Sequence, residues 1–206
     1  MTTAETAPGA SPSRAANGSC RSPAGATAHE LILTPVSGAD IAELYALHAD
    51  PALFRHDSTE PLTELEQMRR VLASWMTHRE QHGFGHVTVR AADDPDGSVL
   101  GVCGASRMRL TGRDVISLYY RFSTKAQGRG VARTAVRALL ADLRTLLGDE
   151  EDIVVATDPD NQPSIRLAES LGLRRTGGVH PTRKAELIVL AGSLADIGVE
   201  HGSEAT

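Results

Sequence analysis

The chain has 206 residues, which suits one domain with a substantial core plus tails. Its formal net charge of −5 lacks the basic footprint of a nucleic-acid-binding domain, and its two cysteines, Cys20 in a tail and Cys103 in a predicted strand, argue against a disulfide framework. No window is apolar enough for a membrane span and the amino terminus lacks the apolar core of a signal peptide, so we expect a cytoplasmic protein.

The ends of the chain differ in composition from the middle. Residues 1–28 consist largely of Ala, Thr, Ser, Gly and Pro, with almost no large apolar residue. Such a segment buries too little surface to offset the entropy cost of ordering. We therefore predict a disordered tail at 1–28, a flexible tail at 200–206, and one folded domain over 29–199.

The first half of this domain predicts a strand, two helices and a β-hairpin. Apolar residues recur at helical spacing in two segments and alternate with polar residues in the strands. The predicted elements are a strand at Glu30–Thr34, a helix that starts at 38–40 and is broken by Asp50–Pro51, a polar loop at Arg55–Pro61, a helix through Leu65–Trp75 that ends by 83–85, and strands at His86–Ala91 and Ser98–Leu110 joined by a turn at Asp93–Gly97.

The stretch Asp114–Leu147 carries the strongest local signals. Val115–Phe122 is a β-branched and aromatic run of strand length, which follows a turn at 111–114. From Ala132 to Leu147 apolar residues, Leu146 among them, recur at three-and-four spacing, and Gly148 supplies the stop. The sequence therefore predicts a central strand followed by a long amphipathic helix.

The remaining elements close the domain. Asp152–Thr157 is a continuous apolar run, as expected for an interior strand covered on both faces. A loop at Asp158–Asn161 leads to a helix at Pro163–Leu171 that Gly172 caps. Two closing strands are predicted at 173–179 and 184–191.

The turn between the central strand and its helix, Gln127–Ala132, has the features of an anion site. Gly128 and Gly130 lack the Cβ atoms that would block a ligand. The helix that follows points unpaired N–H groups and a positive dipole end at the same space, which suits a pyrophosphate. Many such turns bind nothing, so the surrounding motif has to decide.

The order of residues in this turn resembles a known motif. Gln127, Gly130 and Ala132 fit the Gln/Arg-x-x-Gly-x-Gly/Ala signature of the GNAT acyl-CoA-dependent N-acetyltransferases. Asn161 to Ser164 followed by Leu171-Gly172-Leu173 resembles a second motif of that superfamily. Leu31–Pro35 and Asp50–Pro51 resemble the opening of its ribosomal-protein amino-terminal acetylating branch (RimJ/RimL-like), and together the matches cover nearly all of 31–190.

This resemblance implies an α/β fold with a mixed, mostly antiparallel sheet flanked by helices and splayed between its fourth and fifth strands. It also implies acetyl-CoA as co-substrate, held in that cleft, and no metal ion. The expected cofactor-binding residues are Tyr120, Arg121 and Phe122 through their main chain, the turn residues Gln127, Gly128, Arg129, Gly130, Val131, Ala132 and Arg133, and also Asn161 and Ser164. Arg129 and Arg133 can equally be solvated surface arginines, and Asn161 can equally be a helix cap.

The reaction that the resemblance implies is direct attack of an amine on the thioester. Ser164 is the candidate that protonates the departing thiolate, although a first-turn helix serine is an equally good interpretation. Relatives in this branch commonly carry a Glu as base at the position of Ser117, and a serine cannot take that role unaided. His56, Glu60 and His86 remain as candidate bases.

The acceptor is expected to be a protein or peptide α-amine or a small amine, and the acidic loop from Asp57 to Glu66 can attract a cation. We expect no nucleic-acid or membrane partner, and a homodimer is the common default. The departure at Ser117 leaves open a non-catalytic acyl-CoA sensor or interaction module of the same fold. A P-loop protein and a Rossmann dehydrogenase are disfavoured because their glycine motifs are absent.

Overall fold

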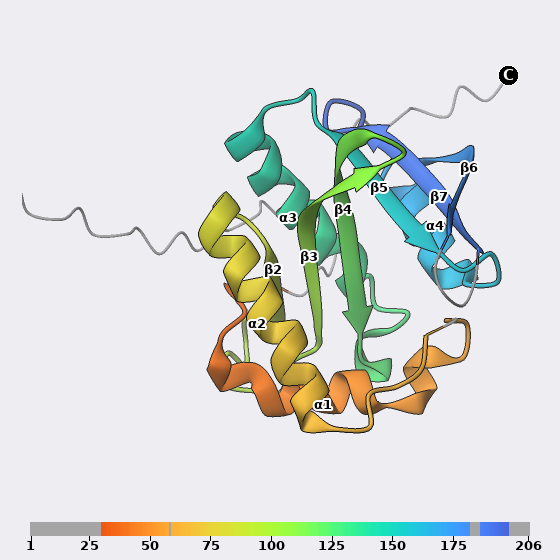
Figure 1. Ribbon diagram of the computed structural model, residues 1–206. Coiled ribbons are helices and arrows are strands. Elements are labelled where there is room, and N and C mark those ends of the chain that lie inside the picture. Colours follow the sequence, from red (N-terminus) through yellow and green to blue (C-terminus); the bar gives the residue numbers. More distant parts are fainter. Residues whose placement is uncertain (1–29, 58, 182–185, 198–206) are drawn as a thin grey trace, which may run out of the picture.

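The computed structural model describes residues 30–57, 59–181 and 186–197, which form a seven-stranded sheet in the order β1-β2-β3-β4-β5-β7-β6. Helices α1 and α2 cover one face of the sheet, and α3 and α4 cover the other (Figure 1). The predicted tails at 1–28 and 200–206 lie outside the described residues. The elements are β1 (Leu31–Pro35), α1 (Ile41–Ala49), α2 (Leu65–His82), β2 (His86–Ala91), β3 (Gly101–Leu110), β4 (Arg113–Phe122), α3 (Val131–Leu147), β5 (Asp152–Thr157), α4 (Gln162–Ser170), β6 (Arg174–Pro181) and β7 (Glu186–Ser193), with short 3₁₀ helices at Gly38–Asp40, Pro51–Phe54 and Thr124–Ala126.

Two predicted boundaries shift in the hairpin that leads to the central strand. The turn between β3 and β4 is only Thr111–Gly112, both with positive φ, so pairing resumes at Arg113 rather than after 114. The strand predicted from Ser98 begins at Gly101, because the N–H of Val99 donates to Glu43 Oε1 (2.8 Å) instead of to a strand. Residues 184 and 185, the start of the last predicted strand, lie outside the described part of the chain.

The core has two main layers, one on each face of the sheet. The larger layer packs α3 and α4 against β2 to β5, and the smaller packs α1 and α2 against β3. Helix α3 buries the predicted face, except that Leu146 in its last turn is 56% exposed. No helix in the described ranges is both long and apolar enough to cross a bilayer.

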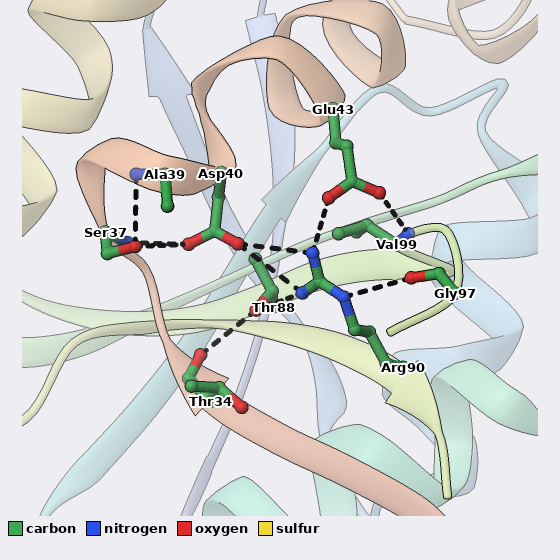
Figure 2. Close-up of polar contacts among 9 residues, drawn as sticks. All are labelled: Thr34, Ser37, Ala39, Asp40, Glu43, Thr88, Arg90, Gly97 and Val99. Atoms are coloured by element: carbon green, nitrogen blue, oxygen red, sulfur yellow. Dashed lines mark hydrogen bonds and ion pairs between the residues drawn. The ribbon is translucent and has the colours of Figure 1, made fainter. Parts of the chain in front are cut away.

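A buried polar cluster fixes α1 to the sheet (Figure 2). Arg90 on β2 pairs with Asp40 (3.4 Å) and with Glu43, and its Nε donates to the carbonyl of Gly97 (3.1 Å). Asp40 also accepts hydrogen bonds from the N–H (2.8 Å) and hydroxyl (2.9 Å) of Ser37. The arginine side chain is 17% exposed and the Asp40 side chain 11%. One guanidinium therefore joins the start of α1 to the β2–β3 loop.

Replacing Arg90 with alanine is expected to lower the free energy of unfolding by about 3 kcal/mol, because a buried carboxylate would be left without its cation. Urea denaturation at neutral pH measures this loss. The matched control is Arg69→Ala, which breaks the exposed pair with Glu66 and should cost less than about 0.5 kcal/mol. Equal losses in the two variants would contradict the structural role of the cluster.

Candidate active site

The two central strands separate at their carboxyl ends. β4 and β5 are parallel and pair only at Ile116 with Ile153 and at Ser117 with Val154. β4 continues beside β3 as far as Phe122, while β5 continues beside β7. The described strands therefore leave the edge of β4 beyond Ser117 open on its β5 side. Such an edge can pair with an extended, amide-rich ligand.

The turn that follows β4 requires its glycines for their backbone angles. Gly128 has a φ of 72° and Gly130 a φ of 74°, a region that side chains rarely adopt. A Cβ added at either position would meet no heavy atom within 4 Å. The surface above both glycines is therefore open, as the sequence predicted for a ligand-binding turn.

The main chain of this turn presents several N–H groups together. The N–H of Thr134 donates to the carbonyl of Gly130 (3.0 Å), and this hydrogen bond closes the first turn of α3. The N–H groups of Val131, Ala132 and Arg133 precede that bond and have no acceptor within the helix. Together with the left-handed Gly130 and the helix dipole, they form an open, positively polarised site. Its chemistry suits a phosphate group.

The side chains of the turn divide between core and solvent. Val131 is only 3% exposed and packs in the core, so it can offer a ligand only its main chain. Gln127, Arg129 and Arg133 are exposed around the turn, and Ala132 is half-buried. The two arginines are near enough in sequence to add positive charge at the turn.

Ser164, near the start of α4, contacts Tyr120 of β4, and Asn161 contacts Ser164. Asn161 caps α4, since its Oδ1 accepts the N–H of Ser164 (3.1 Å). The Tyr120 hydroxyl lies 3.1 Å from the carbonyl oxygen of Ser164 and 3.0 Å from its Oγ. A carbonyl only accepts, so both contacts are satisfied when Tyr120 donates to it and Ser164 donates to the phenol. Burial raises the pKa of Tyr120 to about 12, which keeps this phenol protonated at neutral pH.

Neighbouring side chains of β4 point to opposite faces of the sheet. Leu118 and Tyr120 pack toward α3 and α4, whereas Tyr119 packs toward α1 and α2. Arg121 follows Tyr119 on that second face, and its Nε donates to the Tyr119 hydroxyl (3.0 Å). The Arg121 side chain therefore turns away from the glycine turn, and only its main chain can serve the predicted cofactor role.

The Tyr119 hydroxyl is hydrogen-bonded to a histidine of α1, His48. His48 Nδ1 lies 2.7 Å from the carbonyl oxygen of Leu44, so this nitrogen carries the proton. His48 Nε2 is then the acceptor for the Tyr119 hydroxyl (2.8 Å). Burial lowers the pKa of His48 to about 4, with Arg121 contributing in the same direction against the Leu44 hydrogen bond. His48 is thus neutral with a defined tautomer.

The three candidate bases lie in different surroundings. His56 and Glu60 are exposed on the segment between α1 and α2. His86 is 3% exposed, stacks on Trp75 (ring centroids 4.1 Å apart), and has no hydrogen-bond partner for its Nδ1. Burial, with smaller contributions from His78, Arg79 and His48, lowers the pKa of His86 to about 3. Its protonated form is therefore strongly disfavoured at neutral pH, which weighs against His86 as the base.

Sequence reasoning did not find His48, Tyr119 or Asp57 as members of one network with Arg121. Alternation along β4 indicates that 119 and 121 share a face, but nothing in the spacing brings residues 48 and 57 to them. Ser117 is half-buried on β4, opposite Ser106 and Val154. In the described residues, no group of three or more His, Cys, Asp or Glu side chains is placed to hold a metal ion.

Residues 30–174 match the family described as "Acetyltransferase (GNAT) domain". The chain belongs to the GNAT acetyltransferase family. This confirms the family that the turn, the second motif and the strand order predicted. The mixed sheet with one parallel pair, β4–β5, flanked by helices confirms the predicted GNAT fold class.

Individual relatives of this GNAT protein are distant. The uncharacterized protein YkkB of Bacillus subtilis (strain 168) is 30% identical over 107 residues, which are 51% of this chain and 62% of that protein. The match therefore spans less than two thirds of the length of that curated relative.

Two of the solved structures that resemble the fold show how similar it is. RimL, a ribosomal L7/L12 α-N-protein acetyltransferase in complex with coenzyme A, superposes with a TM-score of 0.66 at 15% identity, covering 81% of this chain and 95% of RimL. A spermidine N-acetyltransferase from Vibrio cholerae, in complex with CoA and spermine, has a TM-score of 0.63 at 16% identity, covering 81% of this chain and 96% of that one. Identities this low show the shared fold.

Proposed function

We propose that this protein is an N-acetyltransferase that moves the acetyl group of acetyl-CoA to a primary amine. The observation that carries the proposal is the left-handed glycine turn at the start of α3, placed directly after a strand whose open edge faces a gap. The glycine turn suits a diphosphate and the open strand edge suits an amide-rich arm. Coenzyme A contains these two groups one after the other. Membership of the GNAT family supports the same assignment.

The chain offers specific groups to each part of acetyl-CoA. The N–H groups from Gly128 to Arg133 are assigned to the diphosphate, with Gln127 beside them. Main-chain groups of Tyr120, Arg121 and Phe122 are assigned to the pantetheine arm. Asn161 already caps α4, so any contact with the ligand is additional to that role.

The chemical step needs one proton removed and one supplied. The amine nitrogen attacks the thioester carbonyl carbon, the C–S bond breaks, and the nitrogen loses a proton while the sulfur gains one. Ser164, whose hydroxyl is hydrogen-bonded to Tyr120, is assigned the role of supplying the proton to the departing sulfur. His56 and Glu60, exposed between α1 and α2, are retained as acceptors of the amine proton, directly or through water.

The amine is a protein or peptide α-amine or a small polyamine-like molecule. RimL acts on a ribosomal protein and the Vibrio cholerae enzyme on spermidine, as their names state, so both classes occur among proteins of this fold. An acyl-CoA-binding module without turnover is the second candidate, and the specific observation that favours it is Ser117 at the position where relatives often carry Glu.

Release of free CoA thiol, followed with a panel of amino-terminal peptides and polyamines, tests the proposal. We expect turnover with at least one amine and binding of acetyl-CoA without any amine. Ser164→Ala should slow the turnover while acetyl-CoA still binds, whereas Ser170→Ala at the far end of α4 should change neither binding nor turnover. Failure to bind acetyl-CoA would refute the proposal, and binding without turnover would favour the second candidate.

A further inference from the structure

One guanidinium on β4 holds three residues of the connection between α1 and α2. Arg121 donates to the carbonyl oxygen of Leu53 (3.2 Å) and to Asp57 Oδ2 (2.8 Å). Its Cζ also lies 3.8 Å from the centre of the Phe54 ring. We call Leu53–Asp57 the anchored segment, because hydrogen bonds, an ion pair and a cation–π contact all converge on it from one side chain.

The arginine that makes these contacts is itself rigidly held. Its Nε donates to the Tyr119 hydroxyl, which donates to the neutral His48 of α1. The Arg121 side chain is 11% exposed and that of Asp57 is 26% exposed. Separating a partly buried pair would leave a poorly compensated charge, so the contact is stronger than a fully exposed ion pair.

The anchored segment lies on the opposite face of β4 from the assigned thiolate group. Tyr120 points toward α4 and meets Ser164, whereas Arg121 points the other way and meets Asp57. Figure 1 shows the connection between α1 and α2 running below the arrowhead of β4, where β4 and β5 have separated. A co-substrate held by the glycine turn would thus reach the gap from one face, with the anchored segment on the other.

We propose that Arg121 is a positioning residue that holds the anchored segment as the wall of the amine-binding side of the site. This inference rests on the proposed acetyltransferase function. Arg55 and His56, both exposed within the segment, are presented at the gap only while the segment is held. Loss of Arg121 therefore impairs amine binding without disturbing the glycine turn, because the main chain of β4 remains.

Two variants test this role by kinetics in the full-length protein. Arg121→Met keeps the aliphatic stem but removes the donors, and Asp57→Asn weakens the ion pair from the other side. We expect the KM for the amine to rise by about tenfold or more in each, and by less than the product of the two effects in the double variant. The KM for acetyl-CoA should change by less than about twofold. A KM for the amine that stays constant in folded variants would overturn the proposal.

Cleavage by trypsin after Arg55 gives a readout that does not depend on activity. Fixing the segment slows local opening, so Arg121→Met should raise the rate of this cleavage by about tenfold or more, as followed by mass spectrometry. The matched control is Arg113→Met, which breaks another ion pair of β4, with Asp152, at the opposite end of the strand. Unchanged cleavage would refute the anchoring, whereas a wild-type protein without turnover would refute the assignment of this wall to an amine site.

Discussion

Replacing Gly130 with aspartate is expected to weaken acetyl-CoA binding by about a hundredfold or more, since like charges brought together at an interface cost several kcal/mol. The new carboxylate would stand beside the N–H groups that begin α3, where the diphosphate is assigned. Its side chain would not clash with the protein, because the space above Gly130 is open. The loss should therefore appear in binding, measured by isothermal titration calorimetry, rather than in the far-ultraviolet circular dichroism.

A matched control separates this effect from backbone strain. Gly112 also has a positive φ, 87°, and an added Cβ there would also meet nothing within 4 Å. It precedes β4, a strand of 10 residues, whereas Gly130 follows it, so the two positions lie beyond opposite ends of that strand. Gly112→Asp should cost a similar amount of stability and leave acetyl-CoA affinity unchanged. Weakened binding in both variants, or in neither, would contradict the assigned phosphate site.

Acidification from pH 7 to about pH 4.5 is expected to lower the free energy of unfolding by about 5 kcal/mol through two buried histidines, His48 and His86. Their pKa values, about 4 and about 3 in the folded protein, lie below the ordinary value of 6.5 that each regains on unfolding. The unfolded chain therefore binds protons first as the pH falls. The stabilisation is complete above pH 6.5 and is lost progressively below it. Burial also lowers the pKa of His78, in the same direction.

Urea denaturation over this pH range, repeated with His86→Phe, checks the source of the effect. Phenylalanine can keep the stacking on Trp75 but does not titrate, so the stability lost on acidification should fall to about half. An unchanged pH dependence in this variant would show that His86 is not responsible. Acid loss of this size is comparable with the whole stability of many single domains, so we expect unfolding near the lower limit of the range.

The elements that the sequence predicted correctly are those with local signals. The apolar repeat from Ala132 to Leu147, the glycine turn before it and the run Asp152–Thr157 each indicate their own structure from neighbouring residues alone. The end of the β2–β3 loop could not be read in this way, because the N–H of Val99 is taken by Glu43, 56 residues earlier. The main-chain part of the candidate site could be proposed from the sequence for the same local reason.

The side-chain part of the site depends on contacts between distant residues. Arg121 and Asp57 are 64 positions apart, and His48 and Tyr119 are 71 apart, so no periodicity links them. The burial of His86 was equally unpredictable, because the residues next to it in the sequence do not indicate that a histidine at the start of a strand is buried. Its stacking on Trp75 and contact with Gly104 arise only when α2 and β3 pack around it.

The two residue pairs that join β4 to β5 divide the sheet into two units, β1–β4 and β5–β7, which meet along a short seam. Each unit keeps its own continuous ladder of hydrogen bonds past that seam. A ligand bound in the opening would contact both units and connect them. The rigidity of the whole sheet would then vary with occupancy, and amide-exchange protection would rise along both margins of the opening at once.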